Sequence, residues 1–499
     1  DEDADVYPNP VVISGHETGI RVSNGSRLEL QRVEVKNNTH QGIQVSENSV
    51  LNVWRGGLTI SGNGLNNDGW DGFGTGLYID RNSTASVDRL VVSGNGRGIY
   101  VGRGSSFSGG WKDEDDTTLP TYMIEINDNK KWGLEVQKNS NVDLNNIEIS
   151  GNGKEVYNND DGSTWYENAL KIQDSSTGNI RNVKLYDNRG NAIDIRNNSK
   201  FHLKDAEILS NGIGSLGDSY DAIRVENHSH LDLNSVTVNS NGRIGLNIYD
   251  YSMAHINTST IENNGTSGEW NNGVNVSQYS HLNLSHSSIS SALGNGLNLN
   301  GNSIGHITNS SIQSTYSDQW GGNAVDISHG SEIYFNYDDR HSTNLITLSA
   351  TSFPLKAYEN GKIHVNTNIS LTSSNNWDPL RLERNSLLYL NKLQDSQTLT
   401  LEKIDAGHNS WIGISGEFKG QLDQVELHGG AVMEIWKDCD PNSNCTPTQT
   451  TIGQLNCHNT TSTDGQAVYR WPVVFLHGND NATTIDTATH WDSDCLVVQ

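Results

Sequence analysis

The sequence predicts an all-β protein, in which a single chain winds into a right-handed parallel β-helix with three short strands in each rung and long loops at one corner. Two observations predict this fold. Apolar residues recur with period two in short segments, and the whole pattern returns every 22 or 23 residues where nothing is inserted. A repeat of that length without a helical period is typical of a β-solenoid. The strong bias of parallel crossovers predicts the right hand.

The clearest copy of the repeat covers residues 133–152, GLEVQKNSNVDLNNIEISGN. Its three expected strands carry the inward pairs Leu134 and Val136, Val142 and Leu144, and Ile147 and Ile149. A Gly or Ala precedes each first strand, and a Ser follows it seven residues later. This step occurs at Gly19/Ser26, Gly42/Ser49, Gly76/Ser83, Gly98/Ser105, Gly133/Ser140, Ala169/Ser176, Ala192/Ser199, Ala222/Ser229, Gly245/Ser252, Gly273/Ser280, Gly296/Ser303 and Ala324/Ser331. Polar turns separate the strands, and we expect stacked Ser and Asn side chains at the corners.

Composition limits the partners of the chain. The hydrophobic fraction is 33% and the net charge is −26, a combination that is also typical of disorder, but the fixed register of Val and Ile argues for a folded solenoid. An acidic chain should repel nucleic acid and anionic membranes. The sequence has no long apolar run of the kind that inserts into a membrane, and we expect a monomer. We interpret the start at residues 1–3 as a processed, mature end.

Three segments are expected. Residues 1–18 are acidic, contain Pro8 and Pro10 and include one strand at 11–13, which predicts an N-terminal cap. Residues 19–437 form the β-helix, in which the register becomes looser after about residue 335 while the alternation continues. Residues 438–499 form a C-terminal cap that carries every cysteine of the chain. Capped ends are expected because the last rung of a solenoid is an open sheet edge.

The four cysteines Cys439, Cys445, Cys457 and Cys495 match no metal-site spacing. We therefore predict two disulfides in an oxidising compartment, and we favour the pairing of Cys439 with Cys445 and of Cys457 with Cys495. A functional thiol is the alternative. No cofactor or metal is predicted, because no specific motif for Ca²⁺ is found.

Five insertions fall at one corner, after the third strand of a rung and before the next first strand. Each carries an aromatic residue beside acidic or amide residues. The aromatic residues, here called the wall residues, are Trp70, Trp165, Tyr166, Tyr220, Trp270 and Trp320. Because rungs stack, insertions at one corner should line one long face. The alternative is that these rings pack loop against loop.

One outward residue lies between the two inward residues of each first strand, at the foot of the expected wall. The floor residues are Glu135, Lys171, Asp194, Arg224, Asn247, Asn275, Asn298 and Asp326, preceded in the same series by Arg21, Gln44, Tyr78 and Tyr100. Aromatic rings pack on sugar rings, and amides and carboxylates bind hydroxyl groups. The sequence therefore predicts a groove for an extended polysaccharide. A merely solvated stripe is the alternative.

An enzyme of the same fold is the second hypothesis. Two carboxylates could give a glycoside hydrolase, and the available pairs are Asp160 with Asp161, Asp218 with Asp221, and Asp194 with Glu135. A polysaccharide lyase would need Ca²⁺-binding acids and a basic proton acceptor, for which Lys171 or Arg224 is available. Neighbouring carboxylates are expected by chance among 59 acidic residues, so we favour binding without catalysis.

The rungs GIQVSENSVLNV, GLYIDRNSTASV and GVNVSQYSHLNL resemble pectate-lyase-like right-handed β-helices, and more closely the passenger domains of autotransporter adhesins (type V secretion). The adhesin resemblance implies secretion to the bacterial cell surface through a separate C-terminal β-barrel. It also implies binding of host glycosaminoglycans and of a host matrix protein such as fibronectin, which we place on another face. The lyase resemblance implies a site with Ca²⁺ and arginine, but its motif cannot be placed on these rungs. A structural spacer is a third hypothesis, which the aligned insertions disfavour.

Overall fold

The computed structural model describes residues 9–54, 56–65, 74–111, 122–155, 157–158, 164–213, 220–265, 271–291, 293–316, 322–337, 345–374, 379–391, 399–407, 409–415, 420–436, 450–458, 473–477 and 496–498. Contacts divide the chain into two compact units. Unit 1 comprises residues 1–255 and 259–268, and unit 2 comprises residues 256–258 and 269–499. Each unit is described by itself.

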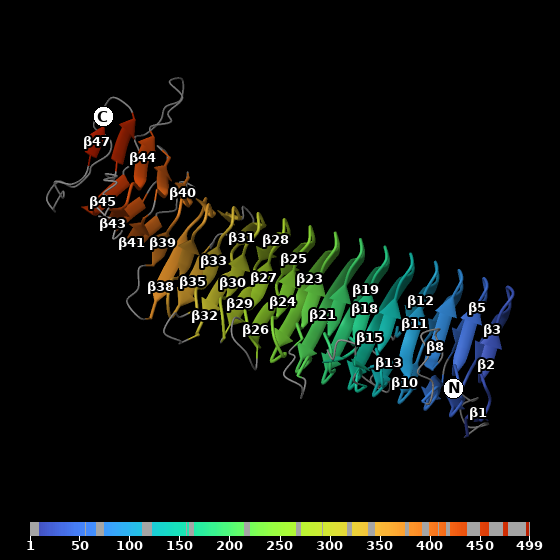
Figure 1. The fold of residues 1–499 in the computed structure, drawn as a ribbon. Helices are drawn as coiled ribbons and strands as arrows, with labels where there is room; N and C mark the ends of the chain where they lie inside the picture. Colours follow the sequence, from blue (N-terminus) through green and yellow to red (C-terminus); the bar gives the residue numbers. More distant parts are fainter. Residues whose placement is uncertain are drawn as a thin grey trace. The chain divides into compact units, whose positions relative to one another are not determined.

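Both units are built from rungs of parallel strands, and the fold is the expected right-handed parallel β-helix (Figure 1). In most rungs the first strand belongs to one sheet, and the second and third strands belong to the other. The second and third strands of several rungs run on as one continuous strand. Every regular element in the described part of the chain is a β-strand, so no helix there is long and apolar enough to cross a membrane.

In unit 1 the first strands are β2 (Ile20–Val22), β5 (Ile43–Ser46), β8 (Thr75–Asp80), β11 (Arg97–Val101), β14 (Leu134–Val136), β18 (Leu170–Ile172), β20 (Ile193–Ile195), β22 (Ile223–Val225) and β24 (Leu246–Ile248). Second strands are β3 (Arg27–Leu30), β6 (Val50–Val53), β9 (Thr84–Val87) and β12 (Ser106–Gly109). Third strands are β1 (Val11–Ser14), β4 (Val33–Lys36), β7 (Leu58–Ser61), β10 (Leu90–Ser93), β13 (Ile124–Asn127) and β26 (Thr260–Asn264). The continuous strands are β15 (Asn141–Ser150), β19 (Thr177–Tyr186), β21 (Lys200–Leu209) and β23 (His230–Asn239), and β25 (Met253–Asn257) begins in this unit.

In unit 2 the first strands are β27 (Val274–Val276), β30 (Leu297–Leu299), β33 (Val325–Ile327), β36 (Leu355–Ala357) and β39 (Leu380–Leu382). Second strands are β28 (His281–Ser285), β31 (Ile304–Thr308), β34 (Glu332–Asn336), β37 (Lys362–Val365), β40 (Leu387–Leu390), β42 (Trp411–Ile414), β44 (Val432–Trp436), β46 (Val473–His477) and β47 (Leu496–Val498). Third strands are β29 (Ser288–Ser291), β32 (Ser311–Ser314), β35 (Ile346–Ala350) and β38 (Ile369–Ser373). From β41 (Leu399–Ala406) onwards, third and first strands merge, as in β43 (Gly420–His428) and β45 (Thr450–His458).

The core is a set of apolar columns, because in-register pairing places equivalent residues directly over one another. One column of unit 1 contains Ile99, Leu134, Leu170, Ile193, Ile223 and Leu246, all of which are buried. The inward pairs predicted in residues 133–152 are buried as well. Phe107 and Phe201 fill the interior at second strands. Period-two alternation therefore identified the core correctly.

Two buried polar ladders form the corners of unit 1. The backbone N–H of Asn129 donates to the side chain of Asn152 over 3.1 Å, and the amide of Asn129 donates to the same oxygen over 2.9 Å. Asn152 repeats both bonds to Asn188. The ladder runs through Asn38, Asn63, Asn95, Asn129, Asn152, Asn188, Asn211, Asn241 and Asn264. At another corner the Oγ atom of each repeat serine accepts from the backbone of the previous one, as from Ser140 to Ser176. Stacked Asn and Ser thus satisfy corner groups that would otherwise be buried without partners.

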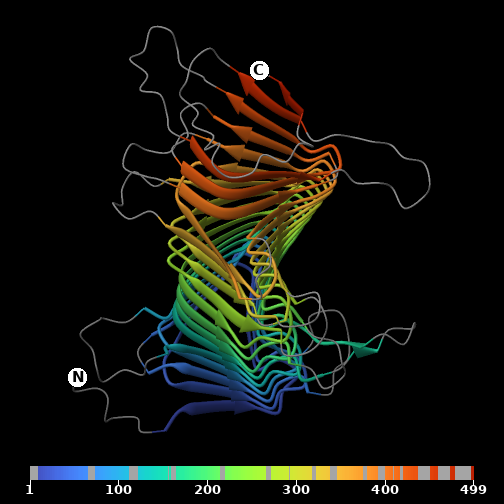
Figure 2. The ribbon, with the colours of Figure 1, turned by 90° about the vertical axis from the view of Figure 1, so that its left-hand side faces the viewer.

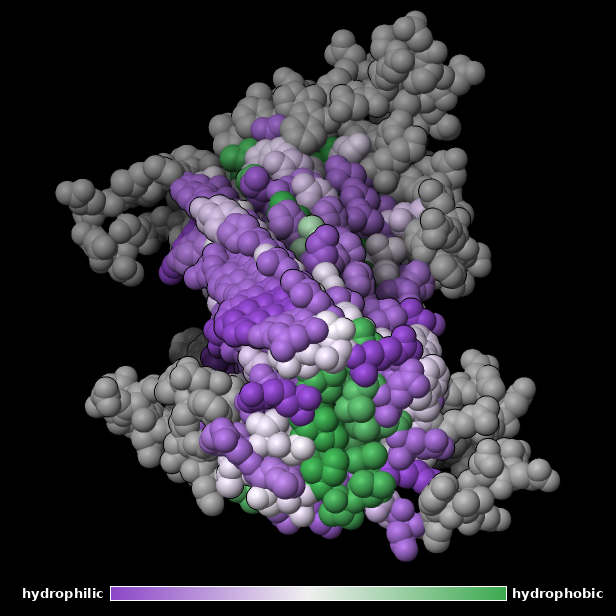
Figure 3. All heavy atoms as spheres, turned by 90° about the vertical axis from the view of Figure 1, so that its right-hand side faces the viewer, coloured by the Kyte–Doolittle hydropathy of each residue, from purple (hydrophilic) through white to green (hydrophobic). Residues whose placement is uncertain are grey.

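Strand pairing extends into both terminal segments. Within residues 1–18, β1 already pairs in parallel with β4, and the apolar side chains of Val11 and Val12 are exposed beside it. Figure 3 faces this end of unit 1 and shows an apolar surface there. Parallel pairing also continues past residue 437 through β45, β46 and β47. Cys439, Cys445 and Cys495 lie outside the described residues, and the side chain of Cys457 in β45 is not described, so both disulfides stay predictions.

Candidate functional site

The floor residues of unit 1 lie in single file. Strand register places Tyr78 beside Tyr100, then Glu135, Lys171, Asp194, Arg224 and Asn247, each one strand further along the sheet. Their side chains point away from the core, since they lie between the two inward residues of each strand. Several are nevertheless covered: Glu135 and Asp194 are 5% and 0% exposed. The candidate site is therefore a polar layer that neighbouring side chains and the corner segments partly enclose.

A second column of side chains lies next to the floor, two residues later in each rung. We define it as Asp80, Gln137, Gln173, Arg196, Glu226 and Tyr249. The sequence analysis did not assign this column, although period-two alternation would have found it, because a residue two positions further along a strand returns to the same face. The second column supplies most hydrogen-bond partners of the floor residues.

Stacked tyrosines occupy one end of the site. The rings of Tyr78 and Tyr100 are parallel within 5°, and their centroids are 4.8 Å apart. The hydroxyl of Tyr78 donates to Asp80 over 3.2 Å, and Gln137 donates to the hydroxyl of Tyr100 over 2.8 Å. Burial, together with the nearby Asp80 carboxylate, raises the pKa of Tyr100 to about 12. Both rings therefore remain neutral donors and acceptors at neutral pH.

The middle of the site is a group of buried carboxylates around Lys171. Its ammonium lies 3.7 Å from Glu135, to which Gln173 also donates over 3.1 Å. Glu167, in the segment just before β18, is 6% exposed. Burial raises the pKa of Glu167 to about 7, against the opposing effect of Lys171. Burial also raises the pKa of Glu135. Two carboxyl groups that resist ionisation thus lie beside one lysine.

An ion-pair network follows on the next strands. Arg196 is hydrogen-bonded to the buried Asp194 and lies 3.4 Å from Glu226. Arg224 donates to Glu226 over 2.6 Å, and the hydroxyl of Tyr249 donates to the same carboxylate. Opposite charges so arranged fix each other's rotamers, and bidentate or multiple hydrogen bonds make such pairs the strongest of their kind.

At the far end of the site in unit 1, the floor residue Asn247 donates to Asp221 over 2.9 Å. Arg243 lies 3.9 Å from the other oxygen of Asp221. Burial raises the pKa of Asp221, which Asn247 and Arg243 partly oppose. This end therefore combines an amide with a mostly enclosed carboxyl group.

The wall residues are only partly described. Tyr166 is buried and packs edge-on against Tyr220, with ring centroids 6.1 Å apart, and the backbone N–H of Tyr166 donates to the hydroxyl of Tyr220 over 2.8 Å. These two rings thus pack loop against loop, as the alternative interpretation held, and Tyr220 is the more exposed of them. Trp70, Trp270 and Trp320 lie outside the described residues, and so does the side chain of Trp165.

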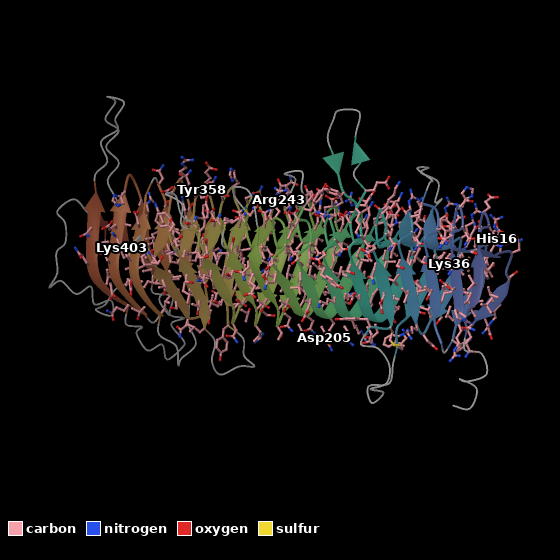
Figure 4. The ribbon with its side chains drawn as sticks, turned by 90° about the horizontal axis from the view of Figure 1, so that it is seen from below. His16, Lys36, Asp205, Arg243, Tyr358 and Lys403 are labelled. Carbon is pink, nitrogen blue, oxygen red and sulfur yellow. The ribbon has the colours of Figure 1, made fainter. Side chains whose placement is uncertain are left out.

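The corner that carries the insertions is a defined edge of unit 1. The insertion between β15 and β18 contains an antiparallel hairpin, β16 (Tyr157–Asn158) and β17 (Thr164–Trp165). Figure 4 shows this hairpin on the same edge as Arg243 and opposite Asp205, and Figure 2 shows it as a teal projection. The edge with the hairpin is therefore the edge beside the first strands.

Unit 2 continues the same pattern within its own sheet. Asn298 donates to the side-chain oxygen of Asn275 over 2.8 Å, and Asp326 follows in register. Asp326 is buried, which raises its pKa to about 6, and it accepts from Asn323 over 2.6 Å. The register then adds residues that the sequence analysis did not assign: Lys356, Arg381, Asp405 and Glu426. Each of these residues lies between two apolar residues, which was a signal for them, but the looser repeat after residue 335 obscured it.

Of the carboxylate pairs considered for catalysis, one lies wholly within the described residues, and its two members are not adjacent. Asp160, Asp161 and Asp218 lie outside the described residues. Glu135 and Asp194 are two strands apart with Lys171 between them. The charge of Glu135 adds to the rise in the pKa of Glu167. With its pKa raised to about 7, Glu167 is a titratable group suited to acid–base chemistry.

The match to a family model agrees with the fold. A family model described as "Right handed beta helix region" matches residues 9–111 and 75–220. The curated proteins contain no match. Solved structures with similarity include pectate lyase Pel9A (12% identity, TM-score 0.29, covering 70% of this chain and 69% of that chain). They also include alginate lyase AlyF-OU02 (12%, 0.30, 98% and 90%) and the Azotobacter vinelandii mannuronan C-5 epimerase AlgE4 A-module (12%, 0.28, 87% and 90%). Similarities at this level carry no argument about activity.

Proposed function

We propose that the chain is a bacterial surface adhesin that binds an extended acidic polysaccharide, of the host glycosaminoglycan class, along the floor residues and the second column of unit 1. The observation that supports this most is the single-file register from Tyr78 to Asn247. Neighbouring strands are about 4.8 Å apart, which is close to the length of one sugar unit in an extended chain. Each rung therefore presents a set of polar groups to one sugar.

The chemistry of the site fits a charged sugar chain. Lys171, Arg196 and Arg224 supply cations for carboxylate or sulfate groups, and their paired acids keep them in place before the ligand arrives. Tyr78 supplies a partly exposed ring next to a hydrogen-bonding hydroxyl. A prearranged site loses less side-chain entropy on binding. These cations are paired with buried acids and are not free basic side chains. We therefore expect the acidic chain to bind nucleic acid poorly.

Removing two of these cations should weaken glycan binding strongly. We expect the double variant Lys171→Ala/Arg224→Ala to bind chondroitin sulfate or heparin at least about tenfold more weakly, because each charge-assisted hydrogen bond contributes about 1.5–3 kcal/mol. Isothermal titration calorimetry at fixed salt measures the change. The control is Lys204→Ala, which removes an exposed lysine that pairs with Asp205 on the other sheet and should leave the affinity unchanged. Equal losses in both proteins would contradict the proposal.

The second candidate is a polysaccharide lyase or hydrolase, which one observation favours. Glu167, with its pKa raised to about 7, lies near Lys171 and Glu135, and a group that titrates near the working pH is suited to general acid–base catalysis. Incubation of the protein with chondroitin sulfate, heparin or polygalacturonate, with and without Ca²⁺, distinguishes the two candidate functions. Steady formation of unsaturated uronate or of new reducing ends, lost in Glu167→Gln, would replace the adhesin with an enzyme. Saturable binding without product supports the adhesin.

A protein partner belongs to the same proposal. Fibronectin would bind the monomeric chain on a face other than the one that carries the floor residues. Immobilised fibronectin should therefore retain the Lys171→Ala/Arg224→Ala variant as well as it retains the parent protein. Parallel loss of fibronectin and glycan binding would place both partners on one face.

A further inference from the structure

Three histidines converge on one aspartate on the outer face of the second strands in unit 1. His202 lies on β21, Asp232 and His230 lie on β23, and His255 lies on β25 within unit 1. This cluster belongs to the sheet formed by second and third strands, whereas the floor residues belong to the other sheet. It therefore lies apart from the candidate glycan site and has no role in it.

The ring nitrogens point at the carboxylate from different directions. Oδ1 of Asp232 lies 2.9 Å from Nε2 of His230 and 3.2 Å from Nδ1 of His255. Oδ2 of the same residue lies 2.6 Å from Nδ1 of His202. The rings of His230 and His255 are nearly perpendicular, at 84°, so that they approach the shared oxygen without stacking on each other. Ligand atoms of His230, Asp232 and His255 all lie within 4.8 Å of one another.

These separations between ligand atoms are close to those found around a bound metal ion. Tetrahedral zinc holds His nitrogen and Asp oxygen at about 2.0–2.2 Å, so that neighbouring ligand atoms are separated by about 3.3 Å. The distances from Oδ1 of Asp232 to Nε2 of His230 and to Nδ1 of His255, 2.9 and 3.2 Å, are near this spacing.

We propose that His230, Asp232 and His255 bind a divalent transition-metal ion of the zinc class on the outer face of unit 1. Zinc commonly binds imidazole nitrogens together with a carboxylate, whereas calcium is bound by oxygen ligands. Two imidazoles and one carboxylate therefore favour zinc. His202 holds the second oxygen of Asp232 and so orients the carboxylate, as partners of metal ligands commonly do. Three protein ligands leave the fourth position to water.

A second cluster shows why this one is preferred. In unit 2, His428 lies 3.3 Å from Asp405 and 3.7 Å from Glu426. Lys403 lies 3.1 Å from Glu426, and Arg381 lies 3.8 Å from Asp405, so that cationic side chains already neutralise both acids. Hydrogen bonding to Asp405 raises the pKa of His428, which favours a proton over a metal on its imidazole. This arrangement is a set of ion pairs.

Zinc titration of the full chain tests the proposal. The protein is stripped with a chelator, its thiols are blocked, and ZnCl₂ is titrated by calorimetry. We expect Asp232→Asn and His255→Asn each to bind one equivalent fewer than the parent protein, or to bind that equivalent at least tenfold more weakly. The matched control is His306→Asn, because His306 lies on an outer second-strand face of unit 2 against Tyr334. It should keep the parental stoichiometry, and CaCl₂ should not compete.

Every result of this experiment is informative. Equal zinc stoichiometry and affinity in the parent and both cluster variants would overturn the proposal. Loss in Asp232→Asn alone, with His255→Asn unchanged, would overturn it too, because the imidazole would then not be a ligand. Circular dichroism of each variant separates loss of the ligand from loss of the fold. If the parent protein binds zinc as expected but binds no glycan, the zinc site is supported and only the proposed function fails.

Discussion

Asn152→Ala should lower the free energy of unfolding by roughly 2–5 kcal/mol, because it removes one member of the buried asparagine ladder of unit 1. The amide of Asn152 donates to Ile126, Ser150 and Asn188, and its oxygen accepts from both the backbone and the side chain of Asn129. Alanine satisfies none of these groups, and each buried group left without a partner costs about 1–3 kcal/mol. Urea unfolding followed by circular dichroism measures the difference.

The control for this prediction is Asn179→Ala. Asn179 points outward and donates once, to Asp143 over 3.0 Å, so its loss should cost less than about 1 kcal/mol. A similar loss for both variants would mean that the ladder contributes no more than a surface hydrogen bond. A solenoid also unfolds in parts, since each rung contacts mainly its neighbours, so the slope of the transition should be compared between the proteins.

Glu167→Gln should make stability less dependent on pH. Burial raises the pKa of Glu167 from 4.5 to about 7, so the folded protein holds this proton more tightly than the unfolded chain does. The contribution of protonated Glu167 to the free energy of unfolding is present below about pH 4.5 and is lost as the pH rises through about 7. At pH 8 the neutral glutamine avoids the buried charge, and the variant should be more stable than the parent by an amount on the order of 3 kcal/mol. At pH 4 the two proteins should be equal.

Thermal unfolding at pH 4, 6 and 8 tests this expectation. Glu207→Gln is the control, because Glu207 is exposed on β21 and its neutralisation should change stability little at any of these pH values. A Glu167→Gln variant that is less stable than the parent at pH 8 would show that the charged carboxylate is stabilised by Lys171 more than it is penalised by burial.

Much of the architecture could be predicted because a solenoid repeats one local solution. Leu134, Val136 and their equivalents alternate with polar residues in every rung, and a fixed step to the corner serine sets the register. The floor residues of unit 1 could be placed in single file for the same reason. After residue 335 the seven-residue spacing from Gly or Ala to Ser is less regular. The strand register still holds through Lys356 and Arg381, but no fixed sequence position marks it.

The contacts of the site could not be predicted, because they depend on depth and on side-chain reach. Asp194 looks like an outward, solvated acid in the sequence, yet Asn168 and Arg196 enclose it. Glu167 belongs to an insertion with no repeat partner, so periodicity carries no information about its burial. Likewise, the packing of Tyr166 on Tyr220 joins two insertions whose lengths differ and whose paths the repeat does not specify.

The register also defines the smallest change in length that this chain tolerates. Lys171 and Asp194 occupy equivalent positions on adjoining strands, so removal of residues 171–193 would join Leu170 directly to Asp194 and restore the alternation at the junction. The ladders would close over the gap, with Ser140 meeting Ser199 and Asn152 meeting Asn211. Removal of one residue fewer would turn every later side chain in that strand to the opposite face. Whole turns are therefore the units in which such a chain can be shortened or lengthened, and the number of sugars spanned by the proposed glycan site would change in steps of one.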